Sequence, residues 1–184
     1  DDSRTHFGIF SPGVTQLFPR GSIVNLHPWE YNEVPVLLAA AMRIPCPLVA
    51  LHLTRPAVEI PDREALGMPS HFEAARGAYV ARDYAPDAPR GGTLFVQGTS
   101  AMRSVVELLP RLVDEGLNVK IVCVTSPELF DAQPKEYRRS VITPHDQADS
   151  TVITTQARRL MQPFLLNSLA EEYALSSDFD DRWR

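Results

Sequence analysis

Apolar and polar positions along the chain follow two periods, which together predict an α/β fold. Residues 22–27 and 48–54 are short, mainly apolar runs, typical of parallel strands that are covered on both faces. Between them, apolar residues recur at spacings of three and four, as in an amphipathic helix that Asn32 is expected to cap. The order strand, helix, strand predicts a right-handed crossover between two parallel strands. The apolar face of the helix is expected to comprise Val34, Leu37, Leu38, Ala41 and Met42.

The stretch 56–92 has a different character, because prolines interrupt it repeatedly and two glycines close it. Only residues 77–84 alternate as a strand does, and they predict the first edge strand of a new unit. We therefore predict three parts: a partial α/β unit over residues 1–62, a linker over 63–76 and a second α/β unit over 77–184.

The second unit shows a clearer alternation of strands and helices. Residues 92–100 predict a strand and turn, followed by a helix that Ser100 caps, that Pro110 bends or splits and that Gly116 ends. Residues 118–126 and 150–155 predict two further strands. Short helices are expected to open at Ser126–Pro127 and at Gln133–Pro134, and no element is predicted beyond Arg158. The fold class is therefore α/β, three-layer, with mostly parallel sheets and a Rossmann-like second unit.

Composition narrows the possible functions. The formal net charge is −5 and no basic patch is interleaved with aromatic residues, which argues against a nucleic-acid binder. Cys46 and Cys123 lie far apart in apolar surroundings, which favours buried thiols over a disulfide and predicts a cytoplasmic location. No apolar run reaches the roughly 18 residues of a membrane span. The chain has no initiator Met, so we expect a fragment of a longer protein.

Two residues are candidates for ligand binding, each with a plainer alternative. Arg55 follows the strand 48–54 directly, at the edge where open α/β sheets bind ligands. It either pairs on the surface with Glu59 or Asp62, or forms a bidentate clamp for a phosphate or carboxylate. His6 is either a loop residue or a group that donates to a substrate oxygen or moves a proton. The five histidines have no metal-ligand spacing, no Cys-x-x-Cys is present, and the single glycine of "VQGTS" favours an ordinary turn over a phosphate loop.

Longer stretches resemble a known family. "HPWEYNEVPVLLAAAMRIPCPLVALHLTRP" is similar to the end of the pyrimidine-binding domain of transketolases, with its Asn-Glu pair and its strand ending in Leu-Thr-Arg. "GAYVARDY" and "GTLFVQGTSAMRSVVELLPRLVDEGLNVKIVCVTSPELFDAQPKEYRRSVI" resemble the family's C-terminal domain, including a Phe-Asp-x-Gln-x-x-x-Tyr-Arg segment. The likeness is co-linear over about residues 21–142. Residues 1–62 would then be the end of the pyrimidine-binding domain, and residues 77–184 the C-terminal domain.

This resemblance implies an enzyme that uses thiamine diphosphate and Mg²⁺ to transfer a two-carbon ketol unit between sugar phosphates, as a cytoplasmic homodimer. It implies that Arg55 binds the substrate phosphate. The regions that bind the cofactor precede this stretch in the family, so the isolated chain is expected to be inactive.

The sequence departs from the family where two substrate-binding histidines are usual: Asp1 and Thr15 stand in their places, and His6 lies between them. Two alternatives therefore stay open. One is an enzyme similar to the first component of 2-oxo acid dehydrogenases, and the other is a non-catalytic dimerisation module.

Overall fold

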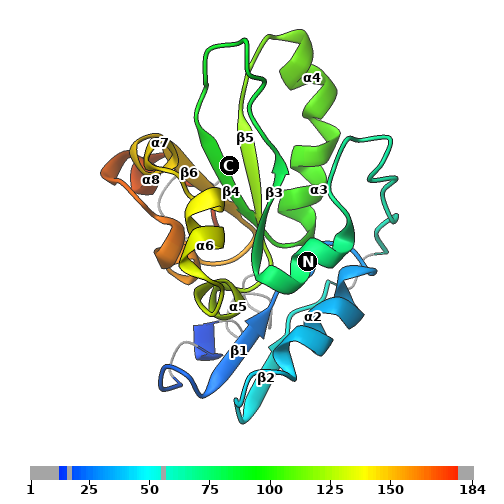
Figure 1. Cartoon of the computed structure of the whole chain (residues 1–184), viewed down its shortest axis with the longest axis vertical. Coiled ribbons are helices and arrows are strands. Elements are labelled where there is room, and N and C mark those ends of the chain that lie inside the picture. The colour runs from blue at the N-terminus through cyan, green and yellow to red at the C-terminus, as the bar shows by residue number, and fades with distance from the viewer. Residues whose placement is uncertain (1–12, 16–17, 55–56, 178–184) are drawn as a thin grey trace.

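The computed structural model describes residues 13–15, 18–54 and 57–177, which form two sheets with flanking helices (Figure 1). No helix in these residues is long and apolar enough to cross a membrane. The strands are β1 (Ile23–Leu26), β2 (Leu48–Leu51), β3 (Ala78–Arg82), β4 (Thr93–Gln97), β5 (Lys120–Val124) and β6 (Ser150–Thr154). The helices are α2 (Glu33–Ala41), α3 (Thr99–Glu107), α4 (Leu109–Asp114), α5 (Pro127–Asp131), α6 (Lys135–Val141), α7 (Pro144–Ala148) and α8 (Ser168–Tyr173), with 3-10 helices η1 (His71–Arg76) and η2 (Arg158–Phe164).

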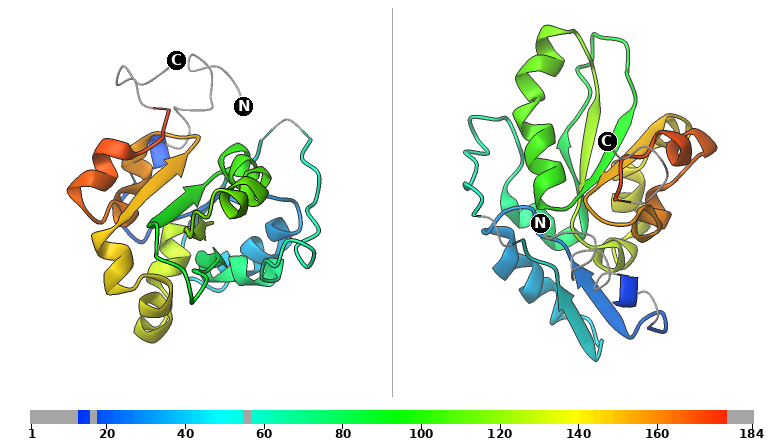
Figure 2. Two further views of the ribbon diagram at one scale, coloured as in Figure 1. Left: turned by 90° about the horizontal axis from the view of Figure 1, so that it is seen from above. Right: turned by 180° about the vertical axis from the view of Figure 1, so that it is seen from behind.

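The larger sheet has the order β3-β5-β4-β6, in which β4 is parallel to both neighbours and β3 is an antiparallel edge strand. Side chains of β5 point alternately into two apolar cores. Ile121 and Cys123 contribute to the core that includes α3, whereas Val122 and Val124 contribute to the core that includes α5, α6 and η2. Helices α3 and α4 lie on one side of the sheet, and the later helices lie on the other (Figures 1 and 2). The predicted three-layer α/β fold is therefore confirmed.

The ends of the helices follow local sequence chemistry, with one correction. The helix predicted around Pro110 is split in two, because α3 ends at Glu107 and α4 begins at Leu109. The Ser126 hydroxyl accepts a hydrogen bond from the Leu129 amide at 3.2 Å and caps α5, as predicted. The prediction that Ser100 caps α3 is wrong, because the helix already begins at Thr99 after Gly98.

The smaller sheet consists of β1 and β2, which are parallel as predicted, and α2 connects them. All four residues of β1 are buried, but in β2 Leu48 is 42% and Val49 is 41% exposed. The prediction that β2 is covered on both faces is therefore wrong for the described residues, in which β1 is its only neighbouring strand. Asn32 precedes α2 as predicted, although its side chain forms no capping hydrogen bond.

The segment predicted as a linker carries a buried cation that joins the two sheets. Arg63 is only 9% exposed, and its Nη2 lies 2.9 Å from Glu30 Oε1 and 2.7 Å from Glu33 Oε1. The Tyr79 hydroxyl of β3 donates to Glu33 Oε1 at 2.7 Å, and the Arg63 guanidinium also lies over the Trp29 ring. Burial raises the pKa of Glu33, although its hydrogen bonds and Arg63 act in the opposite direction. This cluster of five residues is called the Arg63 network below.

Candidate functional site

Two histidines meet where the parallel strands β1 and β2 end. His27 follows β1, His52 follows β2, and the register pairs Leu26 with Leu51. The two imidazole rings are stacked, with their centroids 4.4 Å apart and an angle of 5° between their planes. The carboxyl ends of parallel strands therefore place both rings at the edge of the sheet where α/β proteins bind ligands.

Asn25 connects this edge to helix α5 beside the larger sheet. Its backbone N–H and its side-chain amide donate to the two carboxylate oxygens of Glu128 in α5, at 3.1 and 2.9 Å. The Asn25 amide oxygen is 3.2 Å from His52 Nε2. Because that oxygen can only accept, His52 carries its proton on Nε2. Asn25 thus fixes both the Glu128 carboxylate and the tautomer of His52.

His27 is held from two sides by the larger sheet. Its backbone N–H donates to the carbonyl of Thr125 at 2.7 Å, and its Nδ1 lies 3.2 Å from the amide nitrogen of Gln156. Since the Gln156 amide nitrogen is a donor, Nδ1 accepts and the ring proton lies on Nε2. Burial, followed by the nearby His52, lowers the pKa of His27 well below the ordinary value of 6.5. Burial also lowers the pKa of His52, so both rings are neutral at pH 7.

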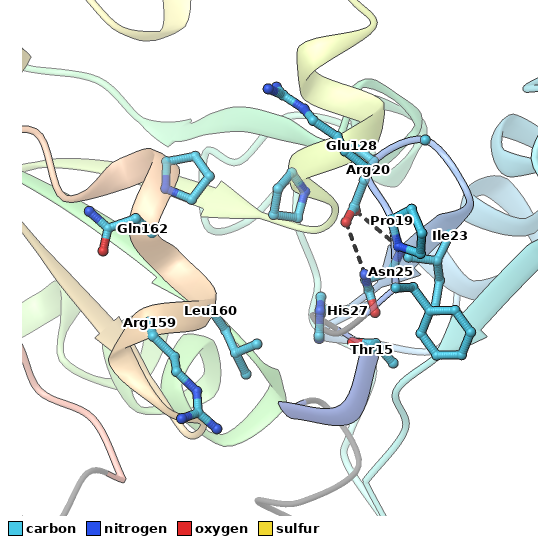
Figure 3. Close-up of a pocket in the computed structure, with 14 residues that line it drawn as sticks. Thr15, Pro19, Arg20, Ile23, Asn25, His27, Glu128, Arg159, Leu160 and Gln162 are labelled. Carbon is cyan, nitrogen blue, oxygen red and sulfur yellow. Dashed lines mark hydrogen bonds between the residues drawn. The ribbon is translucent and has the colours of Figure 1, made fainter.

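A pocket of about 420 Å³ opens beside these groups, within the usual range for small-molecule sites. Figure 3 shows Ile23, Asn25 and His27 along one wall and Arg159 of η2 across the cavity, with Glu128 beside Asn25. The pocket lies between the smaller sheet and the C-terminal domain. A neutral imidazole, amide groups and a guanidinium suit it to a polar ligand that carries an anionic group.

The structure describes only some of the residues that the sequence analysis considered for the site. Arg55 and His6 lie outside the described residues, as does Asp1. Thr15 is described, and it lines the pocket with Asn25 and His27.

Sequence reasoning missed Asn25, His27 and Glu128 as members of one site. The signal available for His27 was its place directly after a strand, which is the argument that singled out Arg55. Nothing in the sequence indicated the contacts of Asn25 with Glu128, because the two residues are 103 positions apart.

The described residues do not provide a Mg²⁺–diphosphate site. No three His, Cys, Asp or Glu side chains among them are grouped so that they could hold a metal ion. Of the carboxylates at this edge, Glu128 is already bonded to Asn25. The donor set here therefore does not fit the cofactor that the family resemblance implies.

The fold and the strand-end pocket define a three-layer α/β protein whose ligands would bind between two α/β units. A family model described as the transketolase-like TK C-terminal domain matches residues 77–172. The chain belongs to the transketolase family.

Known transketolases resemble most of the chain. It is 29% identical over 147 residues to the transketolase of Geobacillus stearothermophilus, a match that covers 78% of this chain and 21% of that protein. The transketolase structure from Leishmania mexicana has a TM-score of 0.64 at 23% identity, and covers 96% of this chain and 23% of its own. A transketolase from Pichia stipitis in complex with sedoheptulose-7-phosphate has a TM-score of 0.65 at 18% identity, over 94% of this chain and 27% of its own. The chain thus spans about a fifth to a quarter of the length of these proteins.

Proposed function

We propose that the chain is the C-terminal part of a transketolase that uses thiamine diphosphate and Mg²⁺ to transfer a two-carbon ketol unit between sugar phosphates. The observation that carries this proposal is the family match over residues 77–172, joined to a strand-end pocket that suits a polar, anionic ligand. The Pichia stipitis relative bound to sedoheptulose-7-phosphate supports a sugar phosphate as the substrate. Thiamine diphosphate supplies the carbanion chemistry in such enzymes, and we assign no part of its binding to the residues described.

We assign phosphate binding to Arg55. The residue follows Thr54, just beyond the strand end at which His27 and His52 are stacked. A guanidinium offers paired donors to a phosphate, and its charge does not depend on pH in the physiological range. His6 is proposed as a donor to a substrate hydroxyl or carbonyl, in place of the family histidines that Asp1 and Thr15 replace.

We also propose that the chain acts only as part of a larger assembly, a homodimer in the cytoplasm. The exposed residues Leu48 and Val49 support this, because a parallel strand usually has a neighbour and a cover on each side. The isolated chain would then neither bind thiamine diphosphate tightly nor turn over substrate. Calorimetry with thiamine diphosphate and Mg²⁺ tests this point, and tight Mg²⁺-dependent binding to the chain alone would contradict it.

The central test is Arg55→Ala in the complete enzyme. Loss of a charged hydrogen-bonded pair is worth about 2 to 3 kcal/mol, so KM for a phosphorylated ketose donor should rise by roughly 30- to 150-fold. KM for the unphosphorylated analogue should change little, because that substrate never formed the contact. Arg43→Ala, at an exposed position after α2, is the matched control and should leave both values unchanged. Equal effects of Arg55→Ala on the two substrates would assign Arg55 a structural role.

A further inference from the structure

A second pocket of about 630 Å³ lies beyond Arg20 and Glu128, which also line the first pocket. It is formed by α5, α6, α7 and η2, together with Arg20, Ile142 and Leu166. Four cationic side chains and two carboxylates line it, which leaves an excess of positive charge in a chain whose net charge is −5. The cations are Arg20, Lys135, Arg138 and Arg139, and the carboxylates are Glu128 and Asp131.

Among the described residues, the carboxylates of the pocket pair with only two of its four cations. Asp131 binds two arginines, with 3.1 Å from its Oδ2 to Arg20 Nη2 and 3.0 Å from its Oδ1 to Arg138 Nη1. Glu128 is turned toward the first pocket, where it accepts both hydrogen bonds from Asn25.

Lys135 and Arg139 form no ion pair with any described residue. They are four positions apart in α6 and therefore lie on the same face of the helix. Their side chains are exposed, so they remain available to an anion from solution.

The floor of the pocket is apolar. Phe130 and Phe164 are buried, with ring centroids 5.8 Å apart, and Ile142 and Leu166 lie beside them. The combination of an apolar floor with a rim of two unpaired cations is specific to this pocket among those described. A ligand that fits both features has an apolar body and a compact group of about two negative charges.

We propose that this pocket binds a small organic phosphate, with the phosphate between Lys135 and Arg139 and the apolar body against Phe130 and Phe164. Arg138 adds its positive charge to the pocket, but its guanidinium is not free for a bidentate contact, because its Nη1 already donates to Asp131. Four residues of the Phe-Asp-x-Gln-x-x-x-Tyr-Arg segment line this site: Phe130, Asp131, Lys135 and Arg138. The proposal does not rest on ketol transfer, since it uses none of the groups assigned to that reaction.

Phenyl phosphate is a suitable probe, because it carries a dianion on an aromatic ring. Isothermal titration calorimetry on the purified chain in low-salt buffer should show binding that weakens as ionic strength rises. The double variant K135Q/R139Q should bind at least about tenfold more weakly, because each lost charge-assisted contact contributes to affinity. The single variants K135Q and R139Q should each have a smaller effect, which keeps the test valid if the double variant folds poorly.

The matched control is R103Q/R111Q, which removes the same total charge from α3 and α4, where both arginines pair with glutamates on the surface. It should bind phenyl phosphate within about twofold of the unmodified chain, since long-range charge is screened by salt. Equal weakening in the two double variants would overturn the site, as would absence of binding to the unmodified chain. Inorganic phosphate binding as tightly as phenyl phosphate would overturn the role of the apolar floor.

Discussion

The two sheets of the molecule contain similar strands but differ in how fully those strands are buried. Every residue of β5 is buried, because β3 and β4 flank it and helices cover both faces. In the smaller sheet, β1 is equally buried, yet β2 leaves Leu48 and Val49 exposed. The four-stranded sheet is thus covered on both faces, and one of its two cores continues into β1 and α2, whereas β2 stays partly uncovered.

This difference shows where the stability of the smaller sheet originates. Besides the apolar core that it shares with α3 and β5, it makes specific polar contacts: the Arg63 network, the Asn25–Glu128 bonds, and the hydrogen bond of His27 with Thr125. Its apolar surface is covered on one side only. We therefore expect substitutions in the polar contacts to affect the smaller sheet first, and substitutions in β5 to affect the whole domain.

The largest effect is expected from Arg63→Met. The change removes the cation and leaves Glu30 and Glu33 buried without a counter-ion, which costs about 3 to 5 kcal/mol in the free energy of unfolding. Urea unfolding, monitored by circular dichroism, measures this loss in the free energy of unfolding. The matched control is Arg103→Met, whose ion pair with Glu107 is exposed and worth less than about 1 kcal/mol. Similar losses in both variants would show that the Arg63 network does not hold the sheets together.

A matched pair of valines compares the two sheets directly. Val122→Thr in β5 buries a hydroxyl at a fully buried position and should cost about 1 to 3 kcal/mol. Val49→Thr in β2, which is 41% exposed, should cost no more than about 0.5 kcal/mol in the isolated chain. In a complete assembly that covers β2, Val49→Thr should become more costly. An equal cost for the two variants in the isolated chain would contradict the view that β2 is the uncovered strand.

A smaller effect is expected from pH. The pKa of His27 is lowered by burial, so the unfolded chain binds its proton more readily and folding stability falls as pH drops below about 6.5. The loss in the free energy of unfolding is at most about 1.4 kcal/mol per pH unit for one histidine. It stops once the pH falls below the pKa of His27 in the folded chain. The raised pKa of Glu33 acts in the opposite direction, so the comparison needs a variant.

Urea unfolding at pH 7.5 and pH 5.5 separates these contributions. In His27→Gln, the part of the pH dependence due to His27 should disappear, whereas His71→Gln, in η1, should retain it. An unchanged pH dependence in His27→Gln would show that this imidazole does not titrate in that range.

The fold was predictable where local chemistry determines it. Pro110 removes a backbone donor in the middle of a long helical pattern, and Ser126 followed by Pro127 is a strong start signal, so the split helix and the start of α5 were both found from the sequence alone. The alternation of side chains in residues 118–126 is also a local property of the sequence, and it identified β5. The exposure of β2 was not predictable, because an apolar run is the same whether or not another strand covers it.

The site was only partly predictable, because its contacts join distant parts of the chain. A strand end singled out Arg55, and the same rule applied to His27 and His52 would have found the stacked rings. No periodicity pairs Asn25 with Glu128 or His27 with Gln156, since these contacts arise only when the two units dock. The cation in the predicted linker was missed for the same reason: Arg63 is buried by neighbours from both units.

Gly77, at the junction of η1 and β3, is held tightly against the residues that follow β5. Its carbonyl accepts hydrogen bonds from the amides of both Thr125 and Ser126, at 2.8 Å each. Its φ of 81° and the close backbone of Phe130 leave no room for a side chain. The start of β3 is therefore anchored to Thr125, the same residue whose carbonyl accepts the His27 amide. One residue thus joins the beginning of the second unit to the strand end of the first.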